Sequence, residues 1–475
     1  MSLTEHIERL RSILSSDEII VPGSDLYRAE SLPWAAQKDL KPATVIRPTN
    51  TESLSKALAY LSKTDLCLGI RSQGVGSASA KDVLISMTAF DDVDFDRQNE
   101  IVTVGAGQSW GQYYEKMDRI APDFATVSVR TPSVGVGGSI LGGGYSWLSS
   151  EYGLTSDPAN LLDAQVVKID GTVLWASEDP ELLWGLRGTN GAFCVVTRFK
   201  LRARKYQPQI WGGYIFIPKT ELRAVVRGIA AMDARPPNPK VAFCLFVMRK
   251  EQLIHMGAKE DMLMILAFDA LGETHGRSDA GFKWALDCPG AVDTTKIIGL
   301  SGMAKLQENV GKAKGMANVW WAPLALSRVD EATLLRAFDW YDNAAASPGS
   351  VAKRVQLFFE IFTTRDSLGS NVDSAWPRPQ GFQHKITLGA GTDIGAPPEE
   401  TEMAKRLVID GPKQIVNTTM PVQVVPNVME GFHDPLTQIY RQHYPRLQAL
   451  KKRYDPDNRL GGPIRLVEAS QNETT

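Results

Sequence analysis

Apolar residues in the first part of the chain, up to about residue 205, form short runs that alternate with stretches of helical spacing. A continuous apolar run predicts a buried strand, and apolar residues spaced by a helical turn predict a helix. At the N-terminus, Ile7, Leu10, Ile13 and Leu14 predict an amphipathic helix. The pattern further predicts strands at 43–48, 65–72, 83–90, 100–107 and 192–205, helices at 51–62 and 110–117, and a hairpin over 160–177 that turns at Asp170-Gly171. We therefore expect an α+β region with glycine-rich connections.

The pattern changes at about Tyr206, where longer apolar runs rich in aromatic residues begin. These runs predict strands of one antiparallel sheet, at 209–217, 240–248, 261–270 and 354–363. Helical spacing lies between them, at 219–233, 277–287 and 330–346. After about residue 425 a helical stretch leads to a closing Asp-Pro-Asp-Asn segment that ends at Asn458. The basic run 451–453 in that stretch is interpreted as a solvated helix face.

The composition is that of a folded globular protein, with 43% hydrophobic and 22% charged residues in a chain of 475. This length predicts two domains, or one large domain with an insertion. A net charge of −2 and scattered basic residues argue against nucleic-acid and membrane partners. No signal peptide or membrane span is evident, so we expect a cytoplasmic protein. The four cysteines lack zinc spacing, which predicts reduced thiols and no metal site.

Three glycine-rich segments carry the strongest chemical signal. The first, residues 71–77, directly follows an apolar run, and its glycines allow successive backbone N–H groups to point into one concavity that suits a pyrophosphate. The second, residues 131–147, has six glycines within the ten residues 135–144, interleaved with large apolar residues. That density favours a packed segment beside a large ligand over a flexible linker. The third, residues 183–197, runs into a predicted strand.

A nicotinamide-binding site is a poorer explanation of these segments. The second segment could be aligned with a G-x-G-x-x-G motif, but no strand, loop and helix with a suitably placed acidic residue follows it. We therefore reject a Rossmann site.

The ordered series of segments resembles the FAD-linked oxidases of the vanillyl-alcohol-oxidase superfamily, and most closely their fungal berberine-bridge-like branch. The resemblance runs from about Pro42 to Pro463, through PATVIRPTNTES, the glycine segments, SSEYGLTSDPANLLDAQVVKIDGTVLWA and YRQHYPRLQALKKRYDPDNRL. It implies an FAD-binding domain in two parts, residues 1–205 and 425–475. A substrate domain, residues 206–424, would be inserted between them as an antiparallel sheet with helices.

The resemblance also implies which residues bind FAD. The first loop would cradle the pyrophosphate, the second would run along the cofactor, and Asn458 would close the site from the tail. The full set is Arg71, Ser72, Gln73, Gly74, Val75, Gly76, Ser77, Pro132, Ser133, Val134, Gly137, Gly138, Ser139, Leu141, Gly142, Gly143, Tyr145, Asp157, Asn160, Leu161, Val195, Val196, His443 and Asn458. Trp147, Trp376 and His384 would line the substrate pocket.

Two departures from the family pattern concern how FAD is held. Many members carry a histidine in the first loop that bonds to the flavin, and bicovalent members add a cysteine before the proline of the second loop. These positions are Val75 and Thr131 here. Neither side chain forms such a bond, so we expect FAD to be bound non-covalently. Ser139 and His443 also replace the family's usual residues.

The reaction implied by the resemblance is hydride transfer from a small organic substrate, a secondary-metabolite intermediate, to flavin N5, with oxygen as the electron acceptor. A side chain must remove the accompanying proton. Candidates are Glu360 and Asp366, near the strand predicted at 354–363, and Tyr145 in the second loop. Val134 stands where small residues leave room for oxygen, which favours an oxidase.

Two other functions remain open at this point. The flavin fold could serve a redox-neutral cyclisation or isomerisation, because both covalent anchors and an obvious base are missing. A non-catalytic binding protein that has lost FAD is the other alternative, and the intact glycine loops argue against it. The sequence does not identify the substrate or the oligomeric state.

Overall fold

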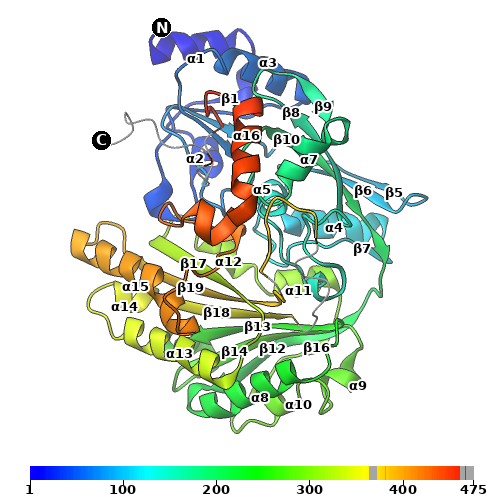
Figure 1. Ribbon diagram of the computed structural model, residues 1–475, viewed down its shortest axis with the longest axis vertical. Helices are drawn as coiled ribbons and strands as arrows, with labels where there is room; N and C mark the ends of the chain where they lie inside the picture. Colours follow the sequence, from blue (N-terminus) through cyan, green and yellow to red (C-terminus); the bar gives the residue numbers. More distant parts are fainter. Residues whose placement is uncertain (363–371, 380, 461–465, 467–475) are drawn as a thin grey trace.

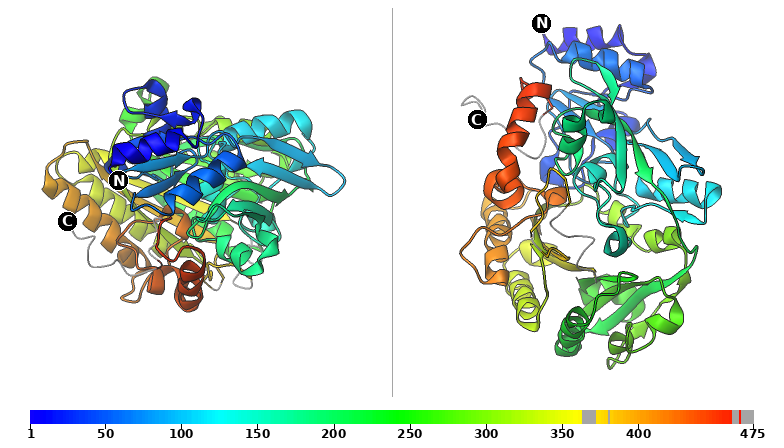
Figure 2. Two further views of the ribbon diagram at one scale, coloured as in Figure 1. Left: turned by 90° about the horizontal axis from the view of Figure 1, so that it is seen from above. Right: turned by 45° about the vertical axis from the view of Figure 1, so that its right-hand side comes forward.

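Four sheets, of four, five, two and eight strands, form in the part of the chain that the structure describes. The protein is seen in a computed structural model that describes residues 1–362, 372–379, 381–460 and 466. Figure 1 shows the smaller sheets in the upper half of the molecule and the eight-stranded sheet in the lower half, and the right-hand view of Figure 2 shows the same stacking.

The first sheet has the order β1-β2-β4-β3. Its strands are β1 (Ile19–Ile20), β2 (Thr44–Ile46), β4 (Val83–Ser86) and β3 (Leu68–Arg71), and the last three run parallel. Helix α3 (Thr51–Leu61) connects β2 to β3 and is capped by Asn50, whose side chain accepts from the Ser53 N–H group. The loop that follows β3 is the first glycine segment.

The second sheet is antiparallel, with the order β5-β6-β10-β8-β9. Its strands are β5 (Val93–Asp96), β6 (Ile101–Gly105), β10 (Val195–Arg202), β8 (Leu161–Val167) and β9 (Val173–Trp175). Beside it lie the short pair β7 (Phe124–Ala125) and β11 (Arg204–Lys205), and the helices α4 (Trp110–Ile120), α5 (Val136–Leu141), α6 (Ser149–Tyr152) and α7 (Pro180–Leu186).

The eight-stranded sheet is antiparallel, with the order β15-β12-β14-β13-β18-β19-β17, and β16 also pairs with β12. Its strands are β12 (Ile210–Pro218), β13 (Val241–Met248), β14 (Met262–Asp269), β15 (Val292–Asp293), β16 (Lys296–Ile298), β17 (Asn318–Leu326), β18 (Gln356–Phe362) and β19 (His384–Thr392). Helices cover its lower face in Figure 1, among them α8 (Leu222–Ala234), α10 (Lys283–Leu286), α13 (Glu331–Ala345) and α15 (Pro398–Val416).

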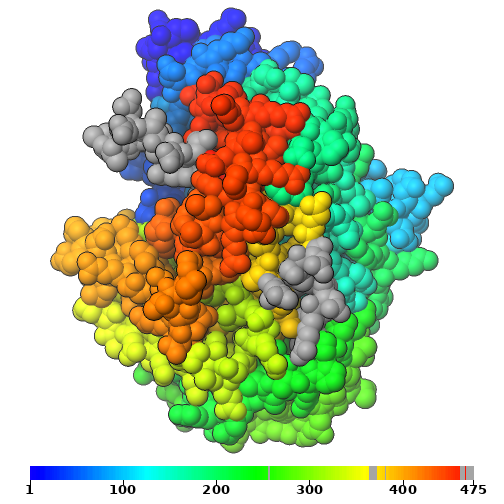
Figure 3. All heavy atoms as spheres, viewed as in Figure 1, coloured from blue at the N-terminus to red at the C-terminus, as the bar shows by residue number. Residues whose placement is uncertain are grey.

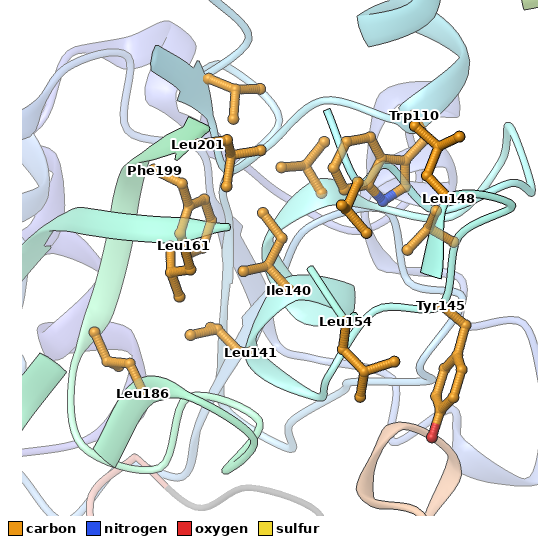
Figure 4. Close-up of a cluster of buried hydrophobic side chains, with 14 of the residues drawn as sticks. Trp110, Ile140, Leu141, Tyr145, Leu148, Leu154, Leu161, Leu186, Phe199 and Leu201 are labelled. Carbon is orange, nitrogen blue, oxygen red and sulfur yellow. The ribbon is translucent and has the colours of Figure 1, made fainter. Parts of the chain in front are cut away.

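Alternation along the strands gives this sheet two different faces. Leu357, Phe359 and Ile361 of β18 pack into the core under the helices. Phe362, by contrast, belongs to the core that also contains α5 and the second sheet. Figure 4 shows part of that second core, where Ile140 and Leu141 of α5 lie among Leu161, Leu186 and Phe199. One continuous core therefore joins the second glycine segment to the upper face of the eight-stranded sheet.

The end of the chain returns to the N-terminal part. Helix α16 (Tyr444–Tyr454) runs along α7, where Arg446 pairs with Glu181 and the Tyr454 hydroxyl donates to Asp179. Figure 3 shows this segment, in red, lying across the surface of the upper half.

Most predicted elements are confirmed, including the strands of both regions, the helices at 51–62, 110–117, 219–233 and 330–346, and the hairpin at 160–177. The helix predicted at 277–287 is wrong, because two short helices, α9 (Glu273–Gly276) and α10, flank a turn there. The sequence pattern missed β5, β17, β19 and α15. Edge strand β17 contains Pro323, β19 contains Gly389 and Gly391, and α15 contains Pro412, all residues that weaken a sequence signal.

The basic run 451–453 is corrected in part. Lys451 is buried, where its Nζ donates to the Ala192 carbonyl at 2.8 Å and to Asp455 at 2.6 Å. Only the next two residues, Lys452 and Arg453, lie on the exposed side of α16.

Among the described residues, none of the helices has the length and apolar character of a membrane span.

Candidate functional site

The first loop presents a row of free backbone donors. Gly74 has φ of +75° and Ser77 has φ of +60°, and the Ser77 N–H group donates to the Gly74 carbonyl at 3.1 Å. Within the described residues, the N–H groups of residues 73–76 donate to no backbone or side-chain acceptor. Successive N–H groups in such a turn form a concavity with positive potential, which binds phosphate oxygens.

Side chains of the first loop hold it in place rather than face a ligand. Ser72 Oγ donates to the Ala106 carbonyl at 2.7 Å, and Gln73 Nε2 donates to the Gly107 carbonyl at 2.7 Å. Arg71 is buried, and its guanidinium bonds the backbone at Ala29 and pairs with Glu30. The loop therefore offers its backbone as the binding surface.

The second loop packs against the first through its glycines. A Cβ atom at Gly135 would lie 2.4 Å from Ser72 Oγ, and one at Gly137 would lie 2.8 Å from the carbonyl oxygen of Ala106, which follows β6 and accepts from Ser72 Oγ. Cβ atoms at Gly76 and Gly138 would meet no atom within 4 Å, and both glycines are exposed. The two loops thus meet along one side and leave Gly76 and Gly138 open. This backbone cradle fits a pyrophosphate-bearing cofactor such as FAD.

The other predicted cofactor residues occupy several settings. Val75, Pro132, Ser133 and Val134 are partly exposed along the same two loops, and the Ser139 hydroxyl accepts from Trp110 Nε1 at 2.8 Å. Leu141, Gly142 and Gly143 end α5, where Gly142 packs against Asn190 of the third segment. Asn160 Nδ2 donates to two carbonyls, and Leu161, Val195 and Val196 are buried in β8 and β10. His443 contacts the Ala375 carbonyl at 3.2 Å, and Asn458 has φ of +51° after α16.

Asp157 has a partner that the sequence did not suggest. Its carboxylate accepts from the Leu154 N–H group at 2.8 Å and forms a buried ion pair with Arg378. Burial lowers the pKa of Arg378 to about 10, so its guanidinium is charged at neutral pH. Asp157 therefore positions Arg378, and contact with the adenine half of FAD stays a prediction.

A second buried ion pair lies on the upper face of the eight-stranded sheet. Glu360 of β18 is fully buried and contacts both Arg130, at 2.5 Å from Nη1, and Lys385 of β19. Lys385 Nζ also lies 4.3 Å from the centre of the Tyr145 ring. Burial and the Arg130 charge lower the pKa of Lys385, and nearby Cys244 opposes that shift.

Aromatic side chains surround this pair. Tyr145 stacks on Phe362 at 6.1 Å between ring centres and meets Phe382 edge-on, and Phe382 in turn packs against Trp376. Trp147 stacks on Phe268 at 5.5 Å. Figure 4 shows the Tyr145 hydroxyl pointing away from the aliphatic core around Leu154. Burial raises the pKa of Tyr145 well above its usual value, so the hydroxyl stays protonated.

Not every predicted residue joins this group. His384 lies on the opposite face of the sheet from Lys385, where it bonds Asp233 of α8 at 2.8 Å and accepts from the Phe362 N–H group. Asp366 lies outside the described residues. Trp147 and Trp376 do lie with Tyr145. The sequence pattern did not single out Arg130, Lys385 or Arg378 as site residues. Lys385 was missed because the strand that carries it was not predicted.

Comparisons with known proteins agree with this geometry. Residues 42–177 match the family model described as FAD binding domain. FAD-dependent monooxygenase prx3 of Penicillium roqueforti is 32% identical over 224 residues, which cover 45% of this chain and 43% of that protein. The match thus spans less than half of the length of that relative. (R)-6-hydroxynicotine oxidase of Paenarthrobacter nicotinovorans is 22% identical and covers 93% of this chain and 95% of its own.

Solved structures share the whole fold. BBE-like 1 of Physcomitrella patens superposes with a TM-score of 0.79 at 15% identity and covers 98% of this chain and 99% of its own. The G164A variant of berberine bridge enzyme, described as a reticuline dehydrogenase, has a TM-score of 0.77 at 16% identity, with 97% and 98% covered. The fold and the backbone cradle define an FAD-binding flavoprotein. Residues 42–177 thus match an FAD-binding domain, and the chain as a whole has the fold of solved berberine-bridge-like proteins.

Proposed function

We propose that the protein is an FAD-dependent oxidoreductase that acts on a small organic molecule of secondary metabolism. The observation that carries the proposal is the backbone cradle, in which four successive N–H groups, at residues 73–76, find no acceptor among the described residues beside the open edge at Gly76 and Gly138. The names of relatives support it, since they include an FAD-dependent monooxygenase and (R)-6-hydroxynicotine oxidase.

FAD, when bound, supplies a two-electron acceptor, which molecular oxygen can reoxidise. The residues of this chain then bind and orient the substrate and take up its proton. We assign proton uptake to the pair Glu360 and Lys385, which are buried, in contact, and flanked by the aromatic side chains of Tyr145 and Phe362. Tyr145 acts as a hydrogen-bond donor, because its raised pKa keeps the hydroxyl protonated. A role for Asp366 stays a prediction.

FAD is bound without a covalent link in this proposal. Val75 and Thr131 stand at the positions of the family's anchoring residues, and neither has the imidazole or thiol that such a bond needs. Cys194 is no substitute, since it is buried in the core and burial raises the pKa of its thiol to about 12.

Anaerobic mixing tests the reaction type. We expect an aromatic alcohol, phenol or amine from a substrate panel to bleach the flavin absorbance when oxygen is excluded, and admission of air to restore it. Conversion of a substrate with the flavin oxidised throughout would contradict the proposal and favour a redox-neutral cyclase or isomerase.

A further inference from the structure

A buried histidine and a buried aspartate are in contact on the side of the eight-stranded sheet that faces away from Tyr145. His384, the first residue of β19, is fully buried, and its Nε2 lies 2.8 Å from Oδ1 of Asp233. Asp233 belongs to α8, below the sheet in Figure 1, and its side chain is 6% exposed. Neither residue belongs to the pair assigned to proton uptake.

The hydrogen bonds of His384 fix which ring nitrogen carries the proton. The Phe362 N–H group donates to Nδ1 at 3.2 Å, so Nδ1 carries no proton and Nε2 holds the one that it donates to Asp233. Oδ2 of Asp233 accepts from the Val329 N–H group at 3.3 Å and lies 3.5 Å from Nε of Arg328. Burial raises the pKa of Asp233, but its bonds to His384 and Val329 and the Arg328 charge outweigh burial and hold that pKa below its usual value. The charged carboxylate therefore favours the tautomer in which His384 accepts from Phe362.

The bond to Phe362 lies where the ladder between β18 and β19 stops. Backbone pairing of these two strands ends at Glu360 and Lys385. Strand β13 holds the other side of β18 as far as Phe362. The His384 ring therefore completes the hydrogen bonding of the last residue of β18, and a side chain takes the place of the next ladder bond.

The strand ends that this ring joins carry the side chains of the candidate site. Phe362 stacks on Tyr145 at 6.1 Å between ring centres, and Glu360 precedes Phe362 by two residues on β18. Lys385 directly follows His384 on β19, and its Nζ lies 4.3 Å from the centre of the Tyr145 ring. A change at His384 therefore displaces side chains on the opposite face of the sheet.

We propose that His384, oriented by Asp233, is a positioning residue that holds the ends of β18 and β19 together, and with them the pair assigned to proton uptake. The imidazole acts through the backbone of Phe362 and does not touch the substrate. This inference rests on the proposed function for the role of that pair. Because a displacement of about 1 Å can slow a reaction about 100-fold, a hydrogen bond on the far side of the sheet controls the rate.

Packing alone is the other explanation of a buried imidazole, and small ligands separate the two. His384→Gly leaves a cavity that imidazole or pyrrole can fill. Imidazole offers an N–H donor to Asp233 and a nitrogen acceptor to Phe362, whereas pyrrole has the same shape and the donor but no acceptor. Pyrrole therefore restores the packing without the bond to Phe362.

The test measures two properties of the FAD-loaded protein, the rate of flavin reduction by substrate without oxygen and the hydrogen exchange of the Phe362 amide. We expect His384→Gly to slow flavin reduction by about 100-fold, imidazole to restore it to within about tenfold of wild type, and pyrrole to leave it slow. Exchange of the Phe362 amide should rise in His384→Gly, fall again with imidazole and stay high with pyrrole.

Asp233→Asn is a second variant, which keeps the size of the side chain. Its amide can donate to Nε2 as well as accept from it, so it no longer excludes the tautomer with a proton on Nδ1, which cannot accept from Phe362. We expect it to slow flavin reduction by about tenfold or more and to raise exchange of the Phe362 amide. The control is His6→Ala in α1 (Leu3–Arg11), far from the sheet in Figure 1, which removes a histidine hydrogen bond to Tyr60 and should match wild type.

Two outcomes would overturn the inference. One is equal recovery of His384→Gly with imidazole and with pyrrole, which would leave packing as its role. The other is flavin reduction and amide exchange at wild-type rates in both His384→Gly and Asp233→Asn. A wild-type flavin that no substrate reduces would refute the proposed function separately, and exchange of the Phe362 amide would still decide whether His384 holds the strand end.

Discussion

Gly135 and Gly138 lie three residues apart in the second loop and have different surroundings. A Cβ atom at Gly135 would lie 2.4 Å from Ser72 Oγ and 2.8 Å from the Gln73 nitrogen, whereas one at Gly138 would meet nothing within 4 Å. Gly135 therefore serves the packing of the two loops, and Gly138 leaves room at the open edge of the cradle.

This difference predicts that alanine at Gly135 and alanine at Gly138 affect different properties of the protein. Gly135→Ala should lower the free energy of unfolding of the FAD-free protein by about 1–3 kcal/mol, because the loops must separate. Gly138→Ala should leave that free energy within about 0.5 kcal/mol of wild type but weaken FAD binding, because the methyl group fills the cradle edge. Denaturant unfolding measures the free energies of unfolding, and titration with FAD measures the affinities. An unchanged FAD affinity in Gly138→Ala would place the cofactor elsewhere.

At the scale of elements, the connection between α11 (Leu300–Lys305) and β17 bridges both cofactor loops. We call residues 307–315 the bridging segment, which includes α12 (Asn309–Lys312). A Cβ atom at Gly311 would lie 2.9 Å from the Ser133 Cβ, and Lys314 Nζ donates to the Gln73 carbonyl at 3.0 Å. A part of the chain that belongs to the large-sheet region thus packs against both glycine loops.

We expect Lys314 to make FAD binding pH-dependent. Burial and the Arg71 charge lower the pKa of Lys314 to about 8, whereas nearby Glu30 opposes that shift. Its cation is present below about pH 8 and lost above it, so affinity for the phosphates should fall as pH rises through this value. Lys314→Met should weaken FAD binding by about tenfold at pH 7 and remove this dependence.

The exposed Lys312, two residues earlier, provides the control for that substitution. FAD dissociation constants measured at pH 7 and pH 9 should be alike for Lys312→Met and wild type. Equal pH dependence in the wild type and in Lys314→Met would show that Lys314 does not act on the cofactor.

For the molecule as a whole, the sequence signals the glycine loops more strongly than the buried side chains on the upper face of the eight-stranded sheet. The glycine loops are contiguous and dense, so their signal is local. The partner of Asp157 is Arg378, which is 221 residues away, and only the fold brings them together. Lys385 lies next to His384 on a strand with two glycines that was not predicted, and alternation directs Lys385 towards Tyr145 and His384 towards Asp233. The domain boundaries at 205 and 425 stay predictions.

The return of the C-terminal helix gives a prediction at this scale. Lys451 joins α16 to the third glycine segment through the Ala192 carbonyl and is buried with Asp455. Lys451→Met removes the cation beside the buried Asp455 carboxylate, which keeps only the hydrogen bonds from the Arg459 and Leu460 N–H groups, and should lower the free energy of unfolding by about 3–5 kcal/mol. Arg453→Met, which breaks an exposed pair with Asp179, should cost less than about 1 kcal/mol. Similar losses in both variants, measured by denaturant unfolding, would contradict the buried role of Lys451.

We propose that the cradle at residues 71–77 and 132–144 holds FAD without a covalent bond. The most direct test is the visible spectrum of the purified protein before and after acid precipitation. We expect a flavin spectrum, and after precipitation the yellow colour should move entirely into the supernatant. Colour that stays in the pellet would contradict the assignment of Val75 and Thr131, and a colourless protein that takes up no FAD would contradict the flavoenzyme itself.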